Sequence, residues 1–235
     1  MTIFFKKWDF DWRAYLAEFL GTFVFVVISS GAILSNVFFG DVGILGVALA
    51  TGLSLSAMMH ATQHISGGHL NPAVTLALWL AQKLAGATAF FYILAQVAAS
   101  LAAAEFLLFI YGERALEFSL GAPKVATGEQ IVLLVEVFLT AVLVFAVFAT
   151  LVDKQGQITM GPLVVGLVVV VATIMAGSLS GAVLNPARVI GPLMVSNSYD
   201  HLAVWIVGPA VGGLFGIVYE WLFGRKSKKF NNKTI

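Results

Sequence analysis

Long apolar stretches separated by short polar segments dominate this chain of 235 residues. Six stretches stand out, at about residues 12–35, 43–63, 84–110, 129–152, 159–178 and 202–223. A helix of roughly 20 apolar residues crosses the hydrocarbon core of a bilayer, which is about 30 Å thick. The strict alternation typical of a membrane β-barrel is absent from the sequence. The pattern therefore predicts an all-α membrane protein with six transmembrane helices, since lipid offers backbone polar groups no partner.

Composition supports this interpretation and limits the chemistry. Hydrophobic residues make up 60% of the chain and charged residues only 11%, whereas soluble domains carry about 25% charged residues. The mean hydropathy is +0.96. Six spans leave little sequence for a soluble part, so we expect a single transmembrane domain over residues 1–235. The segment before the first span lacks the features of a cleaved signal peptide, and the absence of cysteine excludes disulfides and thiolate sites.

Basic residues are distributed unevenly among the segments that flank the six spans. If both termini lie on one side of the membrane, that side holds Lys6, Lys7, Arg13, Lys83, Lys154, Arg225, Lys226, Lys228, Lys229 and Lys233. The opposite side then holds Arg114, Lys124 and Arg188. Cytoplasmic segments carry the excess of Lys and Arg, so we predict a multi-pass protein of the plasma membrane with both termini in the cytoplasm. The basic tail, 224–235, is expected to contact anionic lipid.

Two copies of one motif divide the chain into related halves. Asn-Pro-Ala occurs at Asn71-Pro72-Ala73 and at Asn185-Pro186-Ala187, and Ser-Gly begins five residues before each Asn. A Glu followed by Thr four residues later also repeats, at Glu18 and Glu136, which precede the two Asn residues by 53 and 49 positions. Each half, about 12–112 and 129–223, contains three spans. An odd number of spans inverts the second half in the membrane, and such repeats place their functional centre near the midplane.

The Asn-Pro-Ala motifs predict short helices that begin inside the membrane. Asn is a strong N-cap, and Pro suits the first helical turn because its missing N–H is not needed there. Helix-forming sequence follows over 73–80 and 187–196. Ten helical residues span only about 15 Å, so each half is expected to contain a re-entrant loop and a half-helix. Irregular backbone at that depth is tolerated when it lines a cavity or is buried in protein, and inversion directs the two helix N-termini toward each other.

These motifs resemble those of the aquaporin family, also called major intrinsic proteins. The resemblance rests on both Asn-Pro-Ala motifs, on Arg188 directly after the second, on the two Glu-x-x-x-Thr pairs and on the stretch from His64 to Thr75. Gln96 and the pair Gly208-Pro209 also match family positions. The resemblance covers nearly the whole chain and implies a homotetramer with one pore in each subunit. The short termini and loops suggest a prokaryotic-type member.

The resemblance also implies roles for individual residues. Asn71 and Asn185 would donate hydrogen bonds to permeating molecules, and Arg188 and the half-helices would exclude cations and protons. Glu18, Glu136, His69 and Gln96 would support the re-entrant loops beside the pore. Four positions would set selectivity at the outer constriction: Thr51, Thr173, Ala182 and Arg188. Phe25 and Leu143 each lie seven residues after a repeated Glu and so on the same helix face, and Leu55 and Val169 match each other in family position. These four residues are expected to form an apolar pore wall.

The constriction residues depart from both main subfamilies. Water channels of the family place an aromatic residue and His where this chain has Thr51 and Thr173. Glycerol facilitators place Asp and a basic residue where it has Val189 and Leu193. Two Thr residues predict a wider, hydroxylic constriction, intermediate between the two subfamilies. Because Ala182 stands where many relatives carry a reactive Cys, mercuric salts are not expected to block this pore.

We therefore predict a passive channel for water and small neutral solutes, in contact with membrane lipid. The alternatives are a glycerol or small-polyol facilitator and, from another class, a proton-coupled secondary transporter that would use Glu18 or Glu136. The sequence offers no nucleophile–base pair, phosphate loop or metal-ligand spacing, so we expect no enzyme activity, cofactor, metal or nucleic-acid partner. His60, His201 and Glu105 are interpreted as structural or interfacial residues.

Overall fold

Helices account for most of the chain. The computed structural model describes residues 10–153 and 159–224. Within these residues the order is α1 (Trp12–Phe39), α2 (Gly43–Ser66), α3 (Pro72–Leu80), α4 (Gly86–Tyr111), η1 (Glu113–Gly121), α5 (Glu129–Val147), η2 (Phe148–Val152), α6 (Gly161–Ala176), α7 (Pro186–Val195), α8 (Leu202–Gly213) and α9 (Phe215–Leu222). The prediction of an all-helical membrane fold with two half-helices is confirmed.

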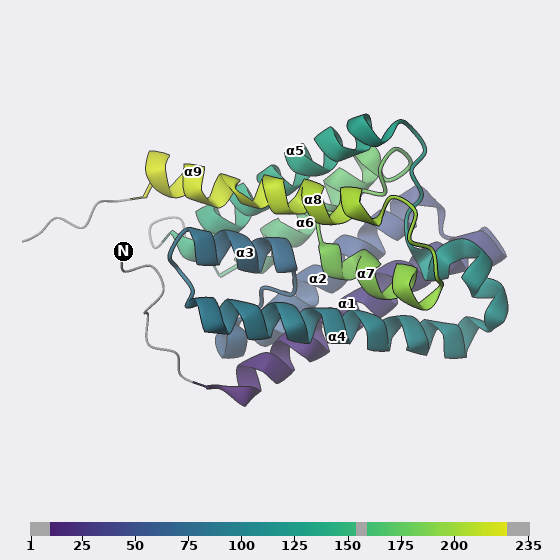
Figure 1. The fold of residues 1–235 in the computed structure, drawn as a ribbon, viewed down its shortest axis with the longest axis horizontal. Coiled ribbons are helices and arrows are strands. Elements are labelled where there is room, and N and C mark those ends of the chain that lie inside the picture. The colour runs from purple at the N-terminus through teal and green to yellow at the C-terminus, as the bar shows by residue number, and fades with distance from the viewer. Residues whose placement is uncertain (1–9, 154–158, 225–235) are drawn as a thin grey trace, which may run out of the picture.

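The two short helices α3 and α7 lie inside a ring of long ones. Figure 1 shows the long helices running along a common direction, with α3 and α7 following each other along that direction in the middle of the bundle. The packing is symmetric between the halves: α1 contacts α2 and α4, as α5 contacts α6 and α8. Each half-helix also packs on the third long helix of the other half, α7 on α4 and α3 on α8. The halves therefore enclose one shared centre.

The halves are joined most extensively where α2 meets α6. A Cβ atom on Gly52 would overlap the Gly166 carbonyl, and one on Gly166 would overlap the Gly52 carbonyl and the Ser56 side chain. Small residues let two helix backbones approach closely in a membrane, where packing rather than water exclusion drives association. Glycine at both positions is thus a requirement of this contact.

The ends of the predicted spans differ from the observed helices for local reasons. α1 continues to Phe39 and ends at Gly40, whose φ of 75° is left-handed and terminates the helix. The fifth predicted span is realised as α6, of only 16 residues, about 24 Å long at 1.5 Å per residue. The sixth is realised as α8 and α9, which follow each other over Leu202–Leu222 with a bond from the Leu214 N–H to the Val211 carbonyl three residues back. Among the described residues, five helical segments are long and apolar enough to cross a membrane, and α8 with α9 is one of them.

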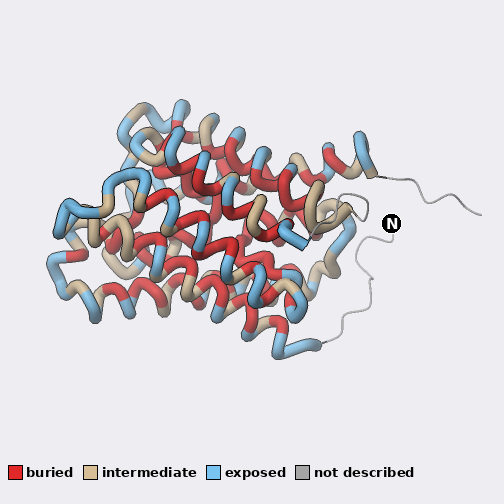
Figure 2. The backbone as a smooth tube through the Cα atoms, turned by 180° about the vertical axis from the view of Figure 1, so that it is seen from behind, coloured by how far each residue is buried: buried red, intermediate tan, exposed pale blue. Residues whose placement is uncertain are grey.

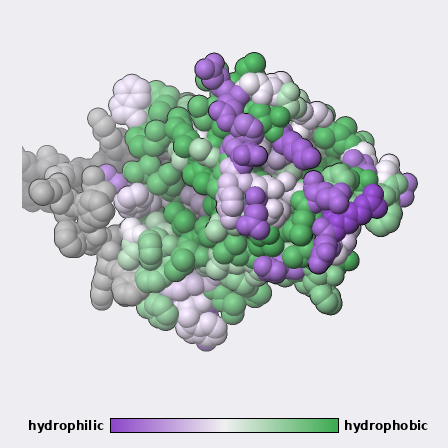
Figure 3. Space-filling view, turned by 45° about the vertical axis from the view of Figure 1, so that its right-hand side comes forward, coloured by the Kyte–Doolittle hydropathy of each residue, from purple (hydrophilic) through white to green (hydrophobic). Residues whose placement is uncertain are grey.

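The surface separates into an apolar side and polar ends. Figure 2 shows that buried residues follow the inner faces of the helices, with exposed residues on the outside and at the ends. Large apolar side chains cover the outside, among them Phe109 and Trp221, which are 84% and 81% exposed. Hydrophilic residues gather at the end that lies on the right in Figure 1, as Figure 3 shows. An apolar belt of this kind is suited to lipid.

Candidate permeation site

The two half-helices begin with the same cap. Asn71 and Asn185 have extended backbones, with φ of −157° and −144°. Their side-chain oxygens accept the N–H of the residue two positions on, Ala73 at 2.8 Å and Ala187 at 3.0 Å. Pro occupies the first helical position in both. The capping predicted from the Asn-Pro dipeptides is therefore the geometry that starts α3 and α7.

The two Asn side chains also join the halves to each other. Asn71 Nδ2 donates to the Leu184 carbonyl at 2.9 Å, and Asn185 Nδ2 donates to the Leu70 carbonyl at 2.8 Å. Both Asn residues are 2% exposed. An amide nitrogen carries two hydrogens, so each Asn retains one after this bond. The reciprocal pair fixes the half-helix N-termini next to each other at the centre of the bundle.

The loops that enter the half-helices have the same strained backbone. Residues four, three and one before each Asn have positive φ: Gly67, Gly68 and Leu70 in the first half, and Gly181, Ala182 and Leu184 in the second. Leucine and alanine in this region cost about 1–3 kcal/mol each and persist only where the surroundings enforce them. The enforcing contacts come from two buried carboxylates.

Glu18 on α1 organises the first loop. Its Oε1 accepts hydrogen bonds from Ser66 Oγ at 2.6 Å and the His69 N–H at 2.9 Å. Its Oε2 accepts from the Leu70 N–H at 2.7 Å and from Gln96 Nε2 at 2.8 Å. Glu18 is fully buried. Its carboxylate thus supplies acceptors to loop N–H groups that have no helix or sheet to bond.

Glu136 on α5 does the same for the second loop. Its Oε1 accepts from Ser180 Oγ at 2.7 Å and the Val183 N–H at 3.0 Å, and its Oε2 accepts from the Leu184 N–H at 2.9 Å. These donors are the counterparts of Ser66, His69 and Leu70. Neither Glu136 nor Glu18 lines either of the two cavities that flank the half-helices.

Three further polar side chains hold the loops and were not anticipated from the sequence. Tyr92 Oη donates to the Ser66 carbonyl at 2.8 Å, and Trp205 Nε1 donates to the Ser180 carbonyl at 2.9 Å. These are equivalent contacts in the two halves. Ser100 on α4 donates to the Ala187 carbonyl and accepts the Gly191 N–H at 2.8 Å. Tyr92 lies four residues before Gln96, and Trp205 lies three residues before Gly208. This similar placement was the signal in the sequence that could have identified both residues.

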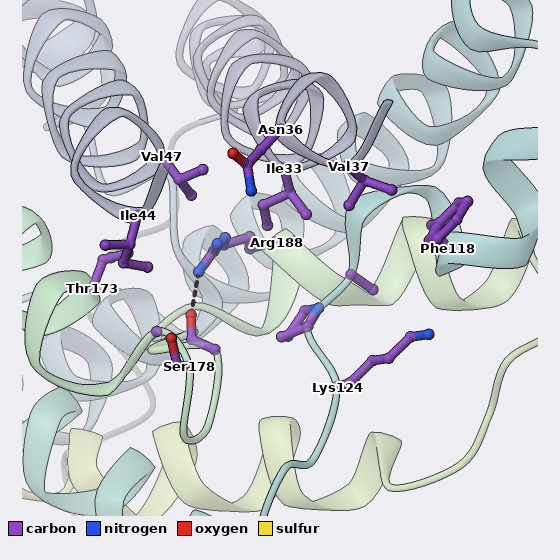
Figure 4. A pocket seen from close by; sticks show the side chains of 14 residues that line it. Ile33, Asn36, Val37, Ile44, Val47, Phe118, Lys124, Thr173, Ser178 and Arg188 are labelled. Atoms are coloured by element: carbon purple, nitrogen blue, oxygen red, sulfur yellow. Dashed lines mark hydrogen bonds between the residues drawn. The ribbon is translucent and has the colours of Figure 1, made fainter. Parts of the chain in front are cut away.

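One cavity, of about 390 Å³, opens beside Arg188; it is called the outer cavity below. Arg188 is 2% exposed, and its Nη1 donates to the carbonyls of Gly181 at 3.0 Å and Ala182 at 2.9 Å. Figure 4 shows Arg188 within the cavity, with Thr173 at one side and Asn36 close by. The Arg188 Nε and the Thr173 hydroxyl have no hydrogen-bond partner among the described residues.

The four expected constriction residues occupy different places around this cavity. Thr173 and Arg188 line it, whereas Ala182 is fully buried and contributes its carbonyl to Arg188. Thr51 is also buried and lies outside the set that lines the cavity; its hydroxyl donates to the Val47 carbonyl at 2.7 Å. Val47, one turn earlier on α2, lines the cavity instead. Thr51 therefore lies one turn farther along α2 than the cavity wall.

A second cavity, of about 230 Å³, is the inner cavity. His69, Gly67 and Gly68 of the first re-entrant loop line it, together with Lys83 and apolar residues. The His69 Nδ1 lies 3.1 Å from Thr75 Oγ1, and its ring packs edge-on against Tyr92 at 5.1 Å. The re-entrant loops thus have a cavity on each side.

The four expected pore-wall residues belong to one buried apolar cluster. Phe25, Leu55, Leu143 and Val169 are each at most 3% exposed and belong to one buried cluster with Leu70 and Leu184. The same cluster contains Met59 and Val74, which line the inner cavity. Four helices, α1, α2, α5 and α6, therefore each contribute one of these four side chains to the cluster that also contains Leu70 and Leu184, the residues directly before the two Asn residues.

The remaining residues singled out in the sequence lie away from the centre. His60 Nδ1 contacts the Ser56 carbonyl at 3.1 Å within α2, and His201 pairs with Glu129 at the start of α5. Glu105 is on the exposed face of α4. Among the described residues, His, Asp and Glu form no group of three that could bind a metal ion.

Comparisons with known proteins agree with this geometry. The sequence profile described as "Major intrinsic protein" matches residues 4–219. Aquaporin TIP4-4 of Zea mays is 41% identical over 224 residues, which cover 90% of this chain and 86% of the relative. Aquaporin NIP1-4 of Oryza sativa subsp. japonica is 39% identical over 201 residues, covering 86% and 73%.

A solved structure has the same fold. The aquaglyceroporin from Plasmodium falciparum superposes with a TM-score of 0.78 at 24% sequence identity, covering 88% of this chain and 94% of that one. The expectation of a prokaryotic-type member is not supported, since the relatives named here are from plants and a protozoan. The chain belongs to the major intrinsic protein family, the aquaporins, and is a multi-pass membrane channel rather than an enzyme.

Proposed function

We propose that this protein is a passive pore for water and small neutral solutes, with the Asn71–Asn185 pair at its narrow centre. The observation that carries the proposal is the reciprocal bonding of Asn71 to the Leu184 carbonyl and of Asn185 to the Leu70 carbonyl. This bonding fixes both amides and leaves one N–H on each for a passing molecule. The outer and inner cavities lie on the two sides of the loops that carry these residues.

Rapid passage of water follows from the few polar groups along the path. The apolar cluster of Phe25, Leu55, Leu143 and Val169 offers no hydrogen bond, so water is held only at the Asn pair and at the constriction. Sites that bind weakly allow fast exit. A water oxygen that accepts from Asn71 and Asn185 has its own hydrogens directed away from the Asn pair, which interrupts proton transfer along the file.

Exclusion of cations is assigned to fixed positive charge. The N-termini of α3 and α7 carry partial positive charge, and Arg188 adds a full charge at the outer cavity. No Asp or Glu is among the described residues that line the two cavities. A cation entering the pore would therefore lose hydration without meeting a compensating carboxylate.

Low discrimination among neutral solutes follows from the constriction. Thr51, Thr173 and Ala182 are small, and Val189 and Leu193 are buried against Trp205 rather than directed to a permeating polyol. A glycerol or small-polyol facilitator is the alternative within the family. A proton-coupled transporter is disfavoured because the carboxylates of Glu18 and Glu136 already accept four and three hydrogen bonds.

The proposal includes the setting of the pore. The chain forms a single channel domain of two inverted repeats and assembles as a homotetramer in contact with lipid. Both termini lie in the cytoplasm, as the distribution of Lys and Arg predicts, and the host membrane proposed is the plasma membrane. The basic tail lies outside the described residues apart from Gly224.

Stopped-flow light scattering on proteoliposomes tests the proposal. Shrinkage under an impermeant osmolyte measures water flux, and re-swelling under glycerol measures solute entry. Fast flux of both, with low activation energy for water, is expected. Fast water flux with slow glycerol entry would refute the proposal that the constriction is open to small solutes. If folded protein gives a water flux no greater than that of empty liposomes, the proposal of a pore is refuted. Glycerol entry that requires a proton gradient would support the transporter.

A further inference from the structure

Among the described residues that line the outer cavity, most are apolar, the polar side chains can donate hydrogen bonds, and none is a carboxylate. The polar lining side chains are Asn36, Lys124, Thr173, Ser178 and Arg188. Figure 4 shows the Asn36 amide and the Arg188 guanidinium in the same part of the cavity, with Lys124 on the other side. The cavity has a volume of about 390 Å³, enough for a small solute together with several waters of about 30 Å³ each.

Three of these donors, Arg188 Nε, the Thr173 hydroxyl and Asn36 Nδ2, have no hydrogen-bond partner among the described residues. Arg188 uses Nη1 for the Gly181 and Ala182 carbonyls, while its buried Nε has no partner among the described residues. Asn36 uses its Oδ1 to accept the Gly43 N–H at 2.7 Å, which orients the amide, and its Nδ2 has no recorded protein partner. A buried guanidinium N–H without an acceptor is energetically unfavourable.

The charge around the cavity is positive. The Arg188 charge interacts with Glu136, whose carboxylate is occupied by the 180–184 loop. Lys124 Nζ lies 5.9 Å from the centre of the Phe118 ring, and Lys124 also lines a neighbouring pocket that contains the carboxylate of Asp200. Lys124 gives the lining of the outer cavity itself a net positive charge that attracts anions.

We infer that the outer cavity is a binding site for a small monovalent oxyanion. One oxygen of the anion accepts from Arg188 Nε and Asn36 Nδ2, and Lys124 and the Thr173 hydroxyl stabilise the remaining charge. Charge-assisted hydrogen bonds from Arg are suited to such groups. The anion is held and not conducted, because the apolar cluster beyond it cannot replace its hydration. Bound anion obstructs the entrance and lowers water flux.

This inference rests on the proposed pore function, and the experiment separates the two. Water flux into proteoliposomes is measured by stopped flow in sodium methanesulfonate and in sodium chloride of equal osmolarity, with each salt on both faces. Methanesulfonate is chosen because it has no neutral form that crosses lipid. Half-maximal inhibition is expected at on the order of 10 mM, since a few hydrogen bonds only modestly exceed the entropy lost on binding.

Matched variants locate the site. Asn36→Asp keeps the oxygen that accepts the Gly43 N–H but replaces the amide donor with a negative charge. Lys124→Gln removes the charge of an exposed side chain, and Arg114→Gln makes the same change outside the cavity lining, where Arg114 packs on Phe38. Each variant is compared with its own flux in chloride. Asn36→Asp and Lys124→Gln should raise the half-inhibitory concentration roughly tenfold, and Arg114→Gln should leave it at the wild-type value.

The water fluxes of the variants decide between the anion site and its absence. Inhibition that weakens in Asn36→Asp and Lys124→Gln alone supports the anion site. Normal water flux without inhibition, or equal inhibition in every variant, overturns the anion site and leaves the pore intact. Absence of water flux in chloride overturns the proposed pore itself. If Asn36→Asp fails to fold, Lys124→Gln still decides the question, because Lys124 is exposed.

Discussion

Glu136→Gln tests whether the buried carboxylate maintains the pore centre. All three of its hydrogen-bond neighbours are donors, the Ser180 hydroxyl and the N–H groups of Val183 and Leu184. A glutamine keeps one acceptor oxygen but replaces the other with an NH₂ group. If the oxygen faces Ser180 and Val183, the NH₂ meets the Leu184 N–H, and donor faces donor in a buried site.

The magnitude follows from these contacts. One buried N–H left unsatisfied costs about 1–3 kcal/mol, and two charge-assisted bonds that become neutral lose about 1 kcal/mol each. The sum is roughly 4 kcal/mol, a large part of a typical stability of about 5–15 kcal/mol. For a chain of this size the melting temperature should fall by roughly 8–16 °C. Because the Leu184 carbonyl accepts from Asn71, displacement of Leu184 should also lower water flux.

The assay pairs stability with transport. The purified protein is heated in detergent, and size-exclusion chromatography measures the fraction that remains folded at each temperature. Stopped flow then gives the water flux per folded protein. Glu105→Gln is the matched control, since it makes the same chemical change on an exposed face of α4. Surface substitutions usually change stability by less than about 0.5 kcal/mol.

The reasoning is refuted if Glu136→Gln melts within about 2 °C of Glu105→Gln, a difference below about 1 kcal/mol for a protein of this size. That result would mean that packing of α7 on α4, rather than the carboxylate, fixes the second loop. If Glu136→Gln is stable but its water flux is reduced, the carboxylate positions Leu184 without contributing much to the overall stability.

Three further predictions concern the pore. Asn71→Ala and Asn185→Ala should each destabilise the protein by about 1–2 kcal/mol, as the loss of an N-cap does. The two losses should be similar because the bonds of the two Asn residues are equivalent. Unequal melting temperatures of the two variants would show that the two caps do not contribute equally to stability. Arg188→Val removes the charge and the two bonds to loop carbonyls, so glycerol re-swelling should become severalfold faster, and an unchanged rate would place the constriction elsewhere. Mercuric chloride should not slow water flux in the cysteine-free wild type; stopped flow with and without the salt is the check, and rapid thiol-reversible block of the wild type would contradict the prediction.

Much of the fold was accessible from local features of the sequence. Apolar length fixes the number of spans, and the Asn-Pro dipeptides fix where α3 and α7 begin. The ends of the spans were less accessible. The sixth span continues through α8 and α9 as expected, whereas α6 begins only at Gly161 and ends at Ala176, and hydropathy does not report such helix ends.

The candidate site was predictable only in part. Glu18 and Glu136 repeat in the sequence and were expected beside the loops, where the structure has them. Tyr92 and Trp205 were missed although their similar placement before Gln96 and Gly208 was a signal, and Ser100 was missed because nothing local distinguishes a buried donor that bonds a distant carbonyl from one that only packs. Val47, rather than Thr51, lines the outer cavity. The prediction missed Val47 because counting back from Asn71 locates a helix face but not the depth at which the cavity ends.

The sequence by itself determined the parts: six apolar spans, two inverted halves, two capped half-helices and a chain without cysteine. These follow from interactions within a few residues, such as capping, or from the transfer of a whole segment into lipid. Only the tertiary structure decided how the parts meet. The bonds from Asn71 to Leu184 and from Asn185 to Leu70 join residues 113 and 115 positions apart. They form because both halves pack around one centre, where each loop supplies the acceptor that the other half's Asn requires.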